Sequence, residues 1–182
     1  YKNPEEANLR ALRKEISDAR DISGGKGLLA INAMVATQQF ADAVKTAVSA
    51  GIDAVISGAG LPLQLPELVP EGSALIAPIV SGGRAAKLIL QSWMNKYHRF
   101  PDFIVLEGSK AGGHLGFKEE DLLSGETPSL ASLLKDVLEN IRPFVDAAKR
   151  NIPVFCAGGV WDQNDIQSLT EQGAAGVQMA TR

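Results

Sequence analysis

A glycine-rich loop carries the residue best suited to proton transfer. Segment 105–116 has the sequence VLEGSKAGGHLG and begins in an apolar run that we expect to form a strand. Histidine titrates near neutral pH, so His114 is suited to donate or accept a proton there. A lone loop histidine more often caps a turn. The flanking glycines, which let the backbone approach a flat ligand, favour a catalytic role instead.

Two further strand ends are suited to bind an anion such as a phosphate. Segment 153–160 has the sequence PVFCAGGV, and its Gly158 and Gly159 precede a helix that we expect to start near Asp162. Amides close to a helix N-terminus favour an anion. Segment 173–182 ends in Ala-Thr-Arg, which adds a hydroxyl and a guanidinium. Together the two ends predict a phosphate site, whereas either one alone also fits a packing turn.

Other residues have weaker claims to chemistry. Segment 81–84, with the sequence SGGR, follows a strand and opens a helix, where it binds an anion or only caps the helix. Lys110 is chemically able to form a Schiff base, but a solvated loop lysine is the commoner role. Cys156 is the single cysteine and lies in an apolar strand, so we expect a small buried side chain and no disulfide. His98 is expected at the surface.

The elements that position these residues alternate along the chain. Continuous apolar runs predict buried strands, as in a parallel sheet covered by helices, at 27–31, 54–56, 74–80, 103–106, 153–157 and 176–179. Helices are expected at 4–20, 40–50, 84–97, 130–149 and 162–172, with a kink or break at Pro143, while 118–129 is expected to be a loop or a small excursion. This order predicts an α/β fold, either an open sheet or part of a (β/α)8 barrel, because a whole barrel needs about 250 residues.

Composition narrows the function classes. The 182 residues are 45% hydrophobic and 21% charged, as in an ordinary globular domain. The net charge is −3 and no basic cluster stands out, so nucleic-acid binding has no electrostatic support. No apolar run reaches the roughly 18 residues of a membrane helix. One cysteine and two histidines argue against a Cys-based or His-only metal site.

The Ala-Gly-Gly-His sequence at 111–114, taken with the two C-terminal strand ends, resembles the FMN-dependent nitronate monooxygenase (2-nitropropane dioxygenase) family. The FMN-dependent enoyl-acyl-carrier-protein reductases share its barrel and motifs. The resemblance implies a (β/α)8 TIM barrel with FMN at its C-terminal mouth. On this alignment residues 1–182 are a single FMN-binding barrel domain with about six of the eight βα units. The first two strands would precede Tyr1, and the end of the barrel would follow Arg182.

The same resemblance implies roles for individual residues. His114 matches the family's catalytic acid or base beside the flavin, and Asn32 matches an Asn at the end of a strand that contacts FMN. The complete set of implied cofactor-binding residues is Asn32, Glu107, Gly112, Gly158, Gly159, Gln178, Met179, Ala180 and Thr181, with no metal ligand. Three positions depart from the family: Ala180 replaces the usual Gly, Glu107 replaces Gln, and Lys110 often corresponds to Glu.

The resemblance implies an enzyme, an FMN-dependent oxidoreductase that oxidises alkyl nitronates with molecular oxygen. The alternative is an FMN- and NAD(P)H-dependent enoyl-acyl-carrier-protein reductase. The residues by themselves also leave open a lyase or aldolase-type barrel that binds a phosphorylated substrate and uses Lys110. A third possibility is a non-catalytic domain that binds flavin or is merely structural. The expected partner is a small-molecule substrate, and binding to nucleic acid or to a membrane is not expected. The expected location of the protein is the cytoplasm. A homo-oligomer stays open.

Overall fold

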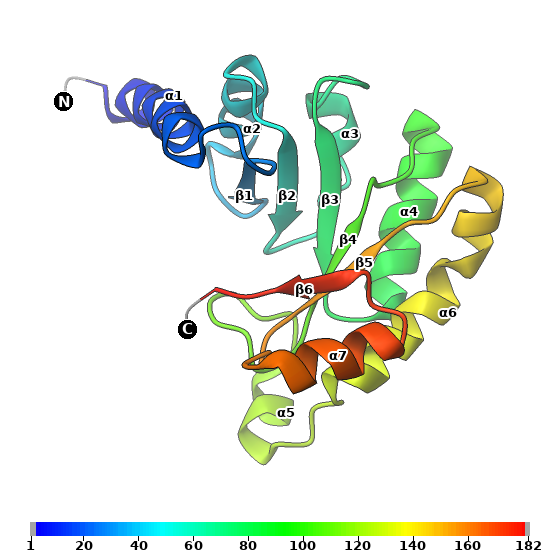
Figure 1. The fold of residues 1–182 in the computed structure, drawn as a ribbon. Helices are drawn as coiled ribbons and strands as arrows, with labels where there is room; N and C mark the ends of the chain where they lie inside the picture. The colour runs from blue at the N-terminus through cyan, green and yellow to red at the C-terminus, as the bar shows by residue number, and fades with distance from the viewer. Residues whose placement is uncertain (1–2, 181–182) are drawn as a thin grey trace. The chain divides into compact units, whose positions relative to one another are not determined.

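Strands and helices alternate along the chain in the computed structural model, which describes residues 3–180 (Figure 1). The elements are α1 (Pro4–Ser23), β1 (Ala30–Met34), α2 (Phe40–Ser49), β2 (Ala54–Gly58), α3 (Leu65–Leu68), β3 (Leu75–Val80), α4 (Gly83–Tyr97), β4 (Ile104–Glu107), α5 (Glu119–Ser124), α6 (Leu130–Ala148), β5 (Val154–Ala157), α7 (Gln163–Glu171) and β6 (Gly176–Gln178). The strand order follows the sequence, from β1 to β6. The chain divides into two compact units, residues 1–77 and 78–182. The expectation of a single domain stays a prediction.

The first unit begins with a helix whose ends follow the sequence signals. Asn3 caps α1 by accepting a hydrogen bond from the Glu6 amide at 3.2 Å, and Pro4 occupies the first turn, where its missing amide costs nothing. α1 and α2 lie side by side (Figure 1). The core of this unit is made of fully buried apolar side chains from α2, β2 and α3, namely Val44, Ala47, Val55 and Leu65.

The first strand lies three residues later than the predicted 27–31. β1 pairs in parallel with β2 from Ala30 opposite Ala54. Gly27 has φ +74, a conformation of turns, and Leu28 is 69% exposed, so the apolar run begins in the preceding turn rather than in the sheet. Asn32 therefore lies in the middle of β1 and does not end it, and its side chain is exposed.

A carboxylate fixes the start of that strand. Asp53 Oδ2 accepts hydrogen bonds from the Leu29 amide and from Arg20 Nη1, both at 2.7 Å. The hydrogen bond from Arg20, and then the one from Leu29, lower the pKa of Asp53 below its ordinary value. The ionised carboxylate thus joins α1 to the turn before β1.

The second unit is a parallel sheet covered by two long helices. β3 pairs with β4, β4 with β5 and β5 with β6, all in parallel. α4 and α6 lie side by side along these strands (Figure 1). Their facing stripes are fully or almost fully buried and include Trp93, Leu90, Leu134 and Val137. Burial of such side chains is the main force that holds the helices on the sheet.

Two helical expectations in this unit can be compared with the structure. A kink or a break was expected at Pro143, and α6 runs through that residue without a break. Pro143 lies on the exposed face, where water can satisfy the carbonyl that loses its intrahelical partner. The segment 118–129, expected to be a loop or a small excursion, contains the short helix α5. This helix has three acidic residues in its first turn, and none of its residues is buried. Acidic side chains there stabilise a helix through its dipole.

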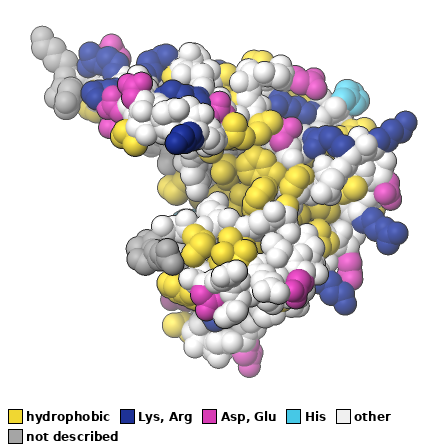
Figure 2. All heavy atoms as spheres, in the orientation of Figure 1, with side chains coloured by type: hydrophobic (Ala, Val, Ile, Leu, Met, Phe, Trp, Pro, Cys, Tyr) yellow, Lys and Arg dark blue, Asp and Glu magenta, His cyan; other side chains and the backbone are white. Residues whose placement is uncertain are grey.

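Charged side chains of both signs are distributed over the surface. Figure 2 shows Lys and Arg interspersed with Asp and Glu on the visible face. No helix within residues 3–180 has an apolar stretch long enough to span a bilayer. In the same residues, no three His, Cys, Asp or Glu side chains gather as a metal ion would require.

Candidate functional site

The carboxyl ends of β4 and β5 meet in the second unit. The ladder places Leu106 opposite Cys156 and Glu107 opposite Ala157, and the Gly108 amide extends it by donating to the Ala157 carbonyl at 2.9 Å. Parallel strands bring their carboxyl ends to one edge, where ligands of α/β folds bind. The two glycine-rich loops singled out from the sequence therefore leave the sheet next to each other.

The turn after β5 is shaped to receive the loop after β4. Gly158 and Gly159 have φ values of +90 and +82, which residues with a side chain rarely adopt. A Cβ at Gly158 would lie 2.8 Å from the Ala111 amide nitrogen, and one at Gly159 would lie 2.9 Å from Cδ of Lys110. The two glycines thus allow the β4 loop to lie directly on the turn.

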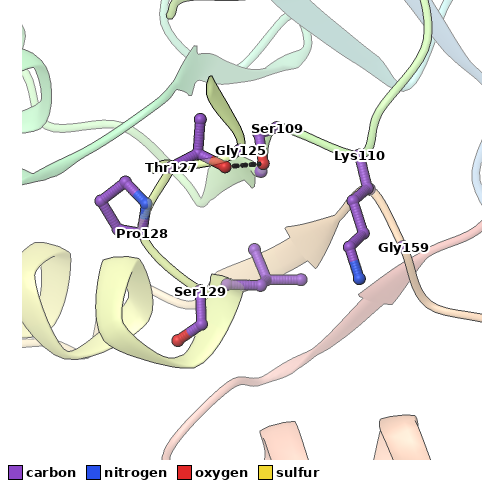
Figure 3. Close-up of a pocket in the computed structure, with 10 residues that line it drawn as sticks. Ser109, Lys110, Gly125, Thr127, Pro128, Ser129 and Gly159 are labelled. Carbon is purple, nitrogen blue, oxygen red and sulfur yellow. Dashed lines mark hydrogen bonds between the residues drawn. The ribbon is translucent and has the colours of Figure 1, made fainter. Parts of the chain in front are cut away.

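A cavity of about 330 Å³ opens beside this contact (Figure 3). Its walls are the β4 loop, the β5 turn and the segment that leads into α6. The lining residues are Gly108, Ser109, Lys110, Gly125, Thr127, Pro128, Ser129, Leu130, Gly158 and Gly159. The hydroxyls of Ser109 and Thr127 are hydrogen-bonded to each other at 2.8 Å, which ties the β4 loop to the opposite wall (Figure 3).

His114 lies outside the cavity lining, in the exposed part of the β4 loop. The loop is held at both ends. At its start Gly108 bonds to Ala157, and near its end the Ser81 hydroxyl, just after β3, donates to the Gly116 carbonyl at 3.1 Å. A Cβ at Gly116 would lie 2.6 Å from the Ser81 Oγ, so the contact requires glycine. The histidine therefore sits on a segment anchored to the ends of two other strands.

Glu107 occupies the last position of β4 and is half-buried. Burial raises the pKa of its carboxyl above the ordinary value, because the low-dielectric surroundings disfavour the charged form. The Glu107 carboxyl is therefore easier to protonate than that of an exposed glutamate.

The other predicted site residues lie in different places. Gln178 ends β6 opposite Ala157, and Met179 and Ala180 follow it with exposed side chains, while Thr181 lies outside the described residues. Gly112 is exposed in the β4 loop. Asn32 belongs to the first unit and is described there by itself.

Two helix N-termini that were candidate anion sites are filled by carboxylates of this chain. The Gly83 amide at the start of α4 donates to Asp136 Oδ2 at 2.6 Å, so segment 81–84 caps its helix with a side chain of α6. At α7, Asp162 and Asp165 form a capping box. The helix end after β5 is therefore not itself an open anion seat. The amides of Gly158 and Gly159, which precede it, have no acceptor among residues 3–180.

Several residues behave as their sequence context indicated, and others were missed. Cys156 is fully buried and burial raises the pKa of its thiol to about 11, so it stays protonated at neutral pH. His98 is exposed at the end of α4. Ser109, Thr127 and Asp136 have no sequence pattern that predicts a role. A hydroxyl in a polar stretch has no distinctive pattern, and nothing in the sequence pairs Asp136 with a glycine on another helix.

Comparison with known proteins gives a consistent result. A model of the family described as nitronate monooxygenase matches residues 1–182. A probable nitronate monooxygenase of Staphylococcus saprophyticus is 30% identical over 150 residues, which is 81% of this chain and 38% of that protein. Nitronate monooxygenase of Pseudomonas aeruginosa is 36% identical over 80 residues, which is 44% of this chain and 20% of that protein.

Solved structures show the same fold. A FabK variant of Thermotoga maritima has a TM-score of 0.74 at 25% identity, over 96% of this chain and 50% of that one. Nitroalkane oxidase of Streptomyces ansochromogenes has a TM-score of 0.73 at 18% identity, over 94% of this chain and 54% of that one. These likenesses confirm the expected incomplete (β/α)8 fold. The chain spans less than half the length of the curated relatives and about half of these structures.

Proposed function

Since the chain belongs to the nitronate monooxygenase family of flavin-dependent oxidoreductases, we propose that it forms the flavin-binding part of an FMN-dependent enzyme that oxidises alkyl nitronates with molecular oxygen. The observation that supports this most is the pair of loops at the ends of β4 and β5. The loop that carries His114 lies against a glycine turn whose two amides have no acceptor among residues 3–180, and a cavity opens beside this contact.

The residues at this cavity fit the phosphate end of FMN. Gly158 and Gly159 offer two amides, and Ser129 offers a hydroxyl. Ser109 and Thr127 are bonded to each other, so this pair has one hydroxyl proton left to donate, and none of the ten lining residues is acidic. Donors without a nearby carboxylate are what a dianionic phosphate requires. We assign Gln178, Met179, Ala180 and Thr181, on and after β6, to the same phosphate end, and Asn32, Glu107 and Gly112 to the rest of the cofactor.

The flavin, when bound, supplies the electron carrier that protein side chains lack. The chain's own part is binding, orientation and proton transfer. His114 holds or moves a proton at the substrate. Its loop is anchored at Gly108 and Gly116, which limits the positions that the imidazole can take. The His114 imidazole would therefore approach the substrate from a restricted set of positions, which favours proton transfer.

The first test is spectroscopic and kinetic, on the full-length protein. We expect oxidised-flavin absorbance bands near roughly 370 and 450 nm. We also expect oxygen consumption with propyl nitronate and little oxidation of NADH. A colourless protein with no flavin after reconstitution with FMN contradicts the proposal.

The second test isolates His114. His114→Ala should lower turnover about 10²-fold to 10⁴-fold while flavin content stays the same, as for loss of a general acid or base. His98→Asn is the matched control, because His98 is the other histidine and Asn tolerates its left-handed backbone at φ 52. Equal turnover of His114→Ala and the parent protein would contradict the acid–base role of His114.

The alternative function is an enoyl-acyl-carrier-protein reductase. It is supported by the likeness to FabK, whose TM-score of 0.74 equals that of the nitroalkane oxidase within 0.01. Rapid reduction of the flavin by NADH or NADPH, followed by reoxidation with an enoyl thioester, would favour this reading over the monooxygenase.

A further inference from the structure

The cavity beside the β5 turn is lined by one positively charged side chain and by no negatively charged one. Of its ten residues, Lys110 is the one cation, Ser109, Thr127 and Ser129 carry hydroxyls, and none carries a carboxylate. The remaining residues are glycines, a proline and a leucine. Such a wall contains hydrogen-bond donors and a positive charge but no negatively charged side chain.

Lys110 is exposed, and the stem of its side chain lies against the glycine turn. The Cβ position of Gly159 lies 2.9 Å from Cδ and 3.0 Å from Cβ of Lys110, so the aliphatic stem lies on the backbone of the turn. Figure 3 shows the Lys110 side chain running past Gly159. Any residue larger than glycine at position 159 would displace this stem, which makes the placement of Lys110 a consequence of the turn itself.

The charge of Lys110 is not neutralised by the chain. Across residues 3–180, no carboxylate oxygen lies within 4.0 Å of its Nζ. The cavity is also lined by Ser129 and Leu130, which are the N-cap and first residue of the 19-residue helix α6. The positive end of a helix dipole therefore adds to the same wall.

We propose that Lys110 binds the phosphate of FMN above the Gly158–Gly159 turn, as a side-chain ligand in addition to the main-chain amides. The inference rests on the proposed FMN binding. Position 110 corresponds to one where family members often have Glu, so a contact between Lys110 and the phosphate would distinguish this chain from such relatives. An ammonium group binds a phosphate as a point charge with up to three donors.

The test compares FMN with riboflavin, which lacks the phosphate. Apoprotein of the full-length enzyme is titrated with each flavin, and the dissociation constant is measured by quenching of flavin fluorescence. Lys110→Ala should weaken FMN binding about 10-fold to 100-fold, as expected for loss of a charged hydrogen bond, and should leave riboflavin binding unchanged. Lys110→Glu should weaken FMN binding further, and Lys110→Arg should retain most of it.

The matched control is Lys118→Ala, because Lys118 is exposed in the segment that follows and does not line the cavity. It should bind both flavins like the parent protein. The FMN dissociation constant of the parent should also rise more steeply with salt than that of Lys110→Ala, since one charge pair is lost. Circular dichroism melts confirm that each variant is folded.

The outcomes separate this inference from the proposed function. If Lys110→Ala binds FMN as tightly as the parent, the protein is a flavoprotein but Lys110 is not a phosphate ligand. If FMN and riboflavin weaken equally, Lys110 shapes the loop and the inference is overturned. If the parent protein binds no flavin, both the inference and the proposed function fail.

Discussion

Two Gly-Gly turns of the second unit look alike in sequence and differ in what their backbone meets. Gly82 and Gly83 follow β3, and Gly158 and Gly159 follow β5; each pair leads toward a helix. At the first turn the Gly83 amide donates to the Asp136 carboxylate at 2.6 Å. At the second turn the amides have no acceptor among residues 3–180, and a cavity opens beside them.

The difference shows that a strand–Gly-Gly–helix sequence does not by itself make an anion site. At the first turn the anion is a side chain of α6, so the glycines serve the packing of α4 on α6. At the second turn the helix end is capped by its own Asp162 and the free amides lie before it. What distinguishes the two is a residue far away in sequence, which only the folded chain reveals.

The largest effect is expected at the filled turn. Gly83 is buried, and a Cβ there would lie 2.6 Å from the Asp136 carbonyl oxygen. Gly83→Ala should therefore lower the free energy of unfolding by about 2–3 kcal/mol, measured by urea denaturation. The control is Gly82→Ala, where φ is 170 and a Cβ would have its nearest contact at 3.5 Å, so it should change stability little. Equal effects of the two variants would contradict the close packing of α4 on α6.

The open turn should respond less in stability and more in function. Gly158→Ala combines a backbone at φ +90 with a contact of 2.8 Å to the Ala111 amide nitrogen, so we expect a loss of about 1–2 kcal/mol. FMN affinity should fall as well, because the β4 loop must move. Gly112→Ala is the stability control, since its Cβ would meet nothing within 4 Å. Unchanged FMN affinity in a folded Gly158→Ala protein would contradict the view that the β5 turn, unlike the β3 turn, serves the cofactor.

Removing the internal carboxylate should have a smaller effect. Asp136→Ala deletes the acceptor of the Gly83 amide and should cost about 1 kcal/mol in thermal or urea unfolding, with FMN affinity unchanged. Glu139→Ala, on the same helix, removes an exposed ion pair to Lys135 at 4.0 Å and should cost less. A loss of FMN binding in Asp136→Ala would mean that the filled turn also serves the cofactor.

The smallest effect on stability is expected in the first unit, where the Asp53 carboxylate also accepts a hydrogen bond from a backbone amide, that of Leu29. Its pKa is lowered in the folded protein, so its stabilising effect is present above the ordinary value of 3.8 and is lost as the pH falls through the lower folded value. The urea midpoint of the parent protein should therefore drop more steeply in this acid range than that of Asp53→Asn. Identical pH profiles would show that the hydrogen bonds from Arg20 and Leu29 contribute nothing to stability.

The sequence predicted the parts of the fold that burial dictates. β5 is a continuous apolar run, and so is β4 up to its last residue, Glu107. Both lie within one residue of their predicted bounds, because a strand covered on both faces is apolar along most of its length. β1 was misplaced because the apolar Leu28 belongs to an exposed turn. α5 was missed because it buries nothing and so has no apolar periodicity.

The site was predictable to a similar degree. Parallel topology alone implies that the loops after β4 and β5 meet, and the contact of Gly158 with Ala111 confirms it. The third wall of the cavity could not be predicted, since it depends on where α6 starts relative to β4. The bond between Ser109 and Thr127 joins residues whose proximity follows from that packing. The roles assigned to His114 and to the cofactor-binding residues stay predictions.

Ala111 and Lys110 pack directly on Gly158 and Gly159, and this contact has a practical consequence for engineering. A β4 loop transplanted from a relative will seat correctly only if its residues at these two positions suit the β5 turn of the recipient. A loop exchange intended to change specificity should therefore transfer the β4 loop and the β5 turn together.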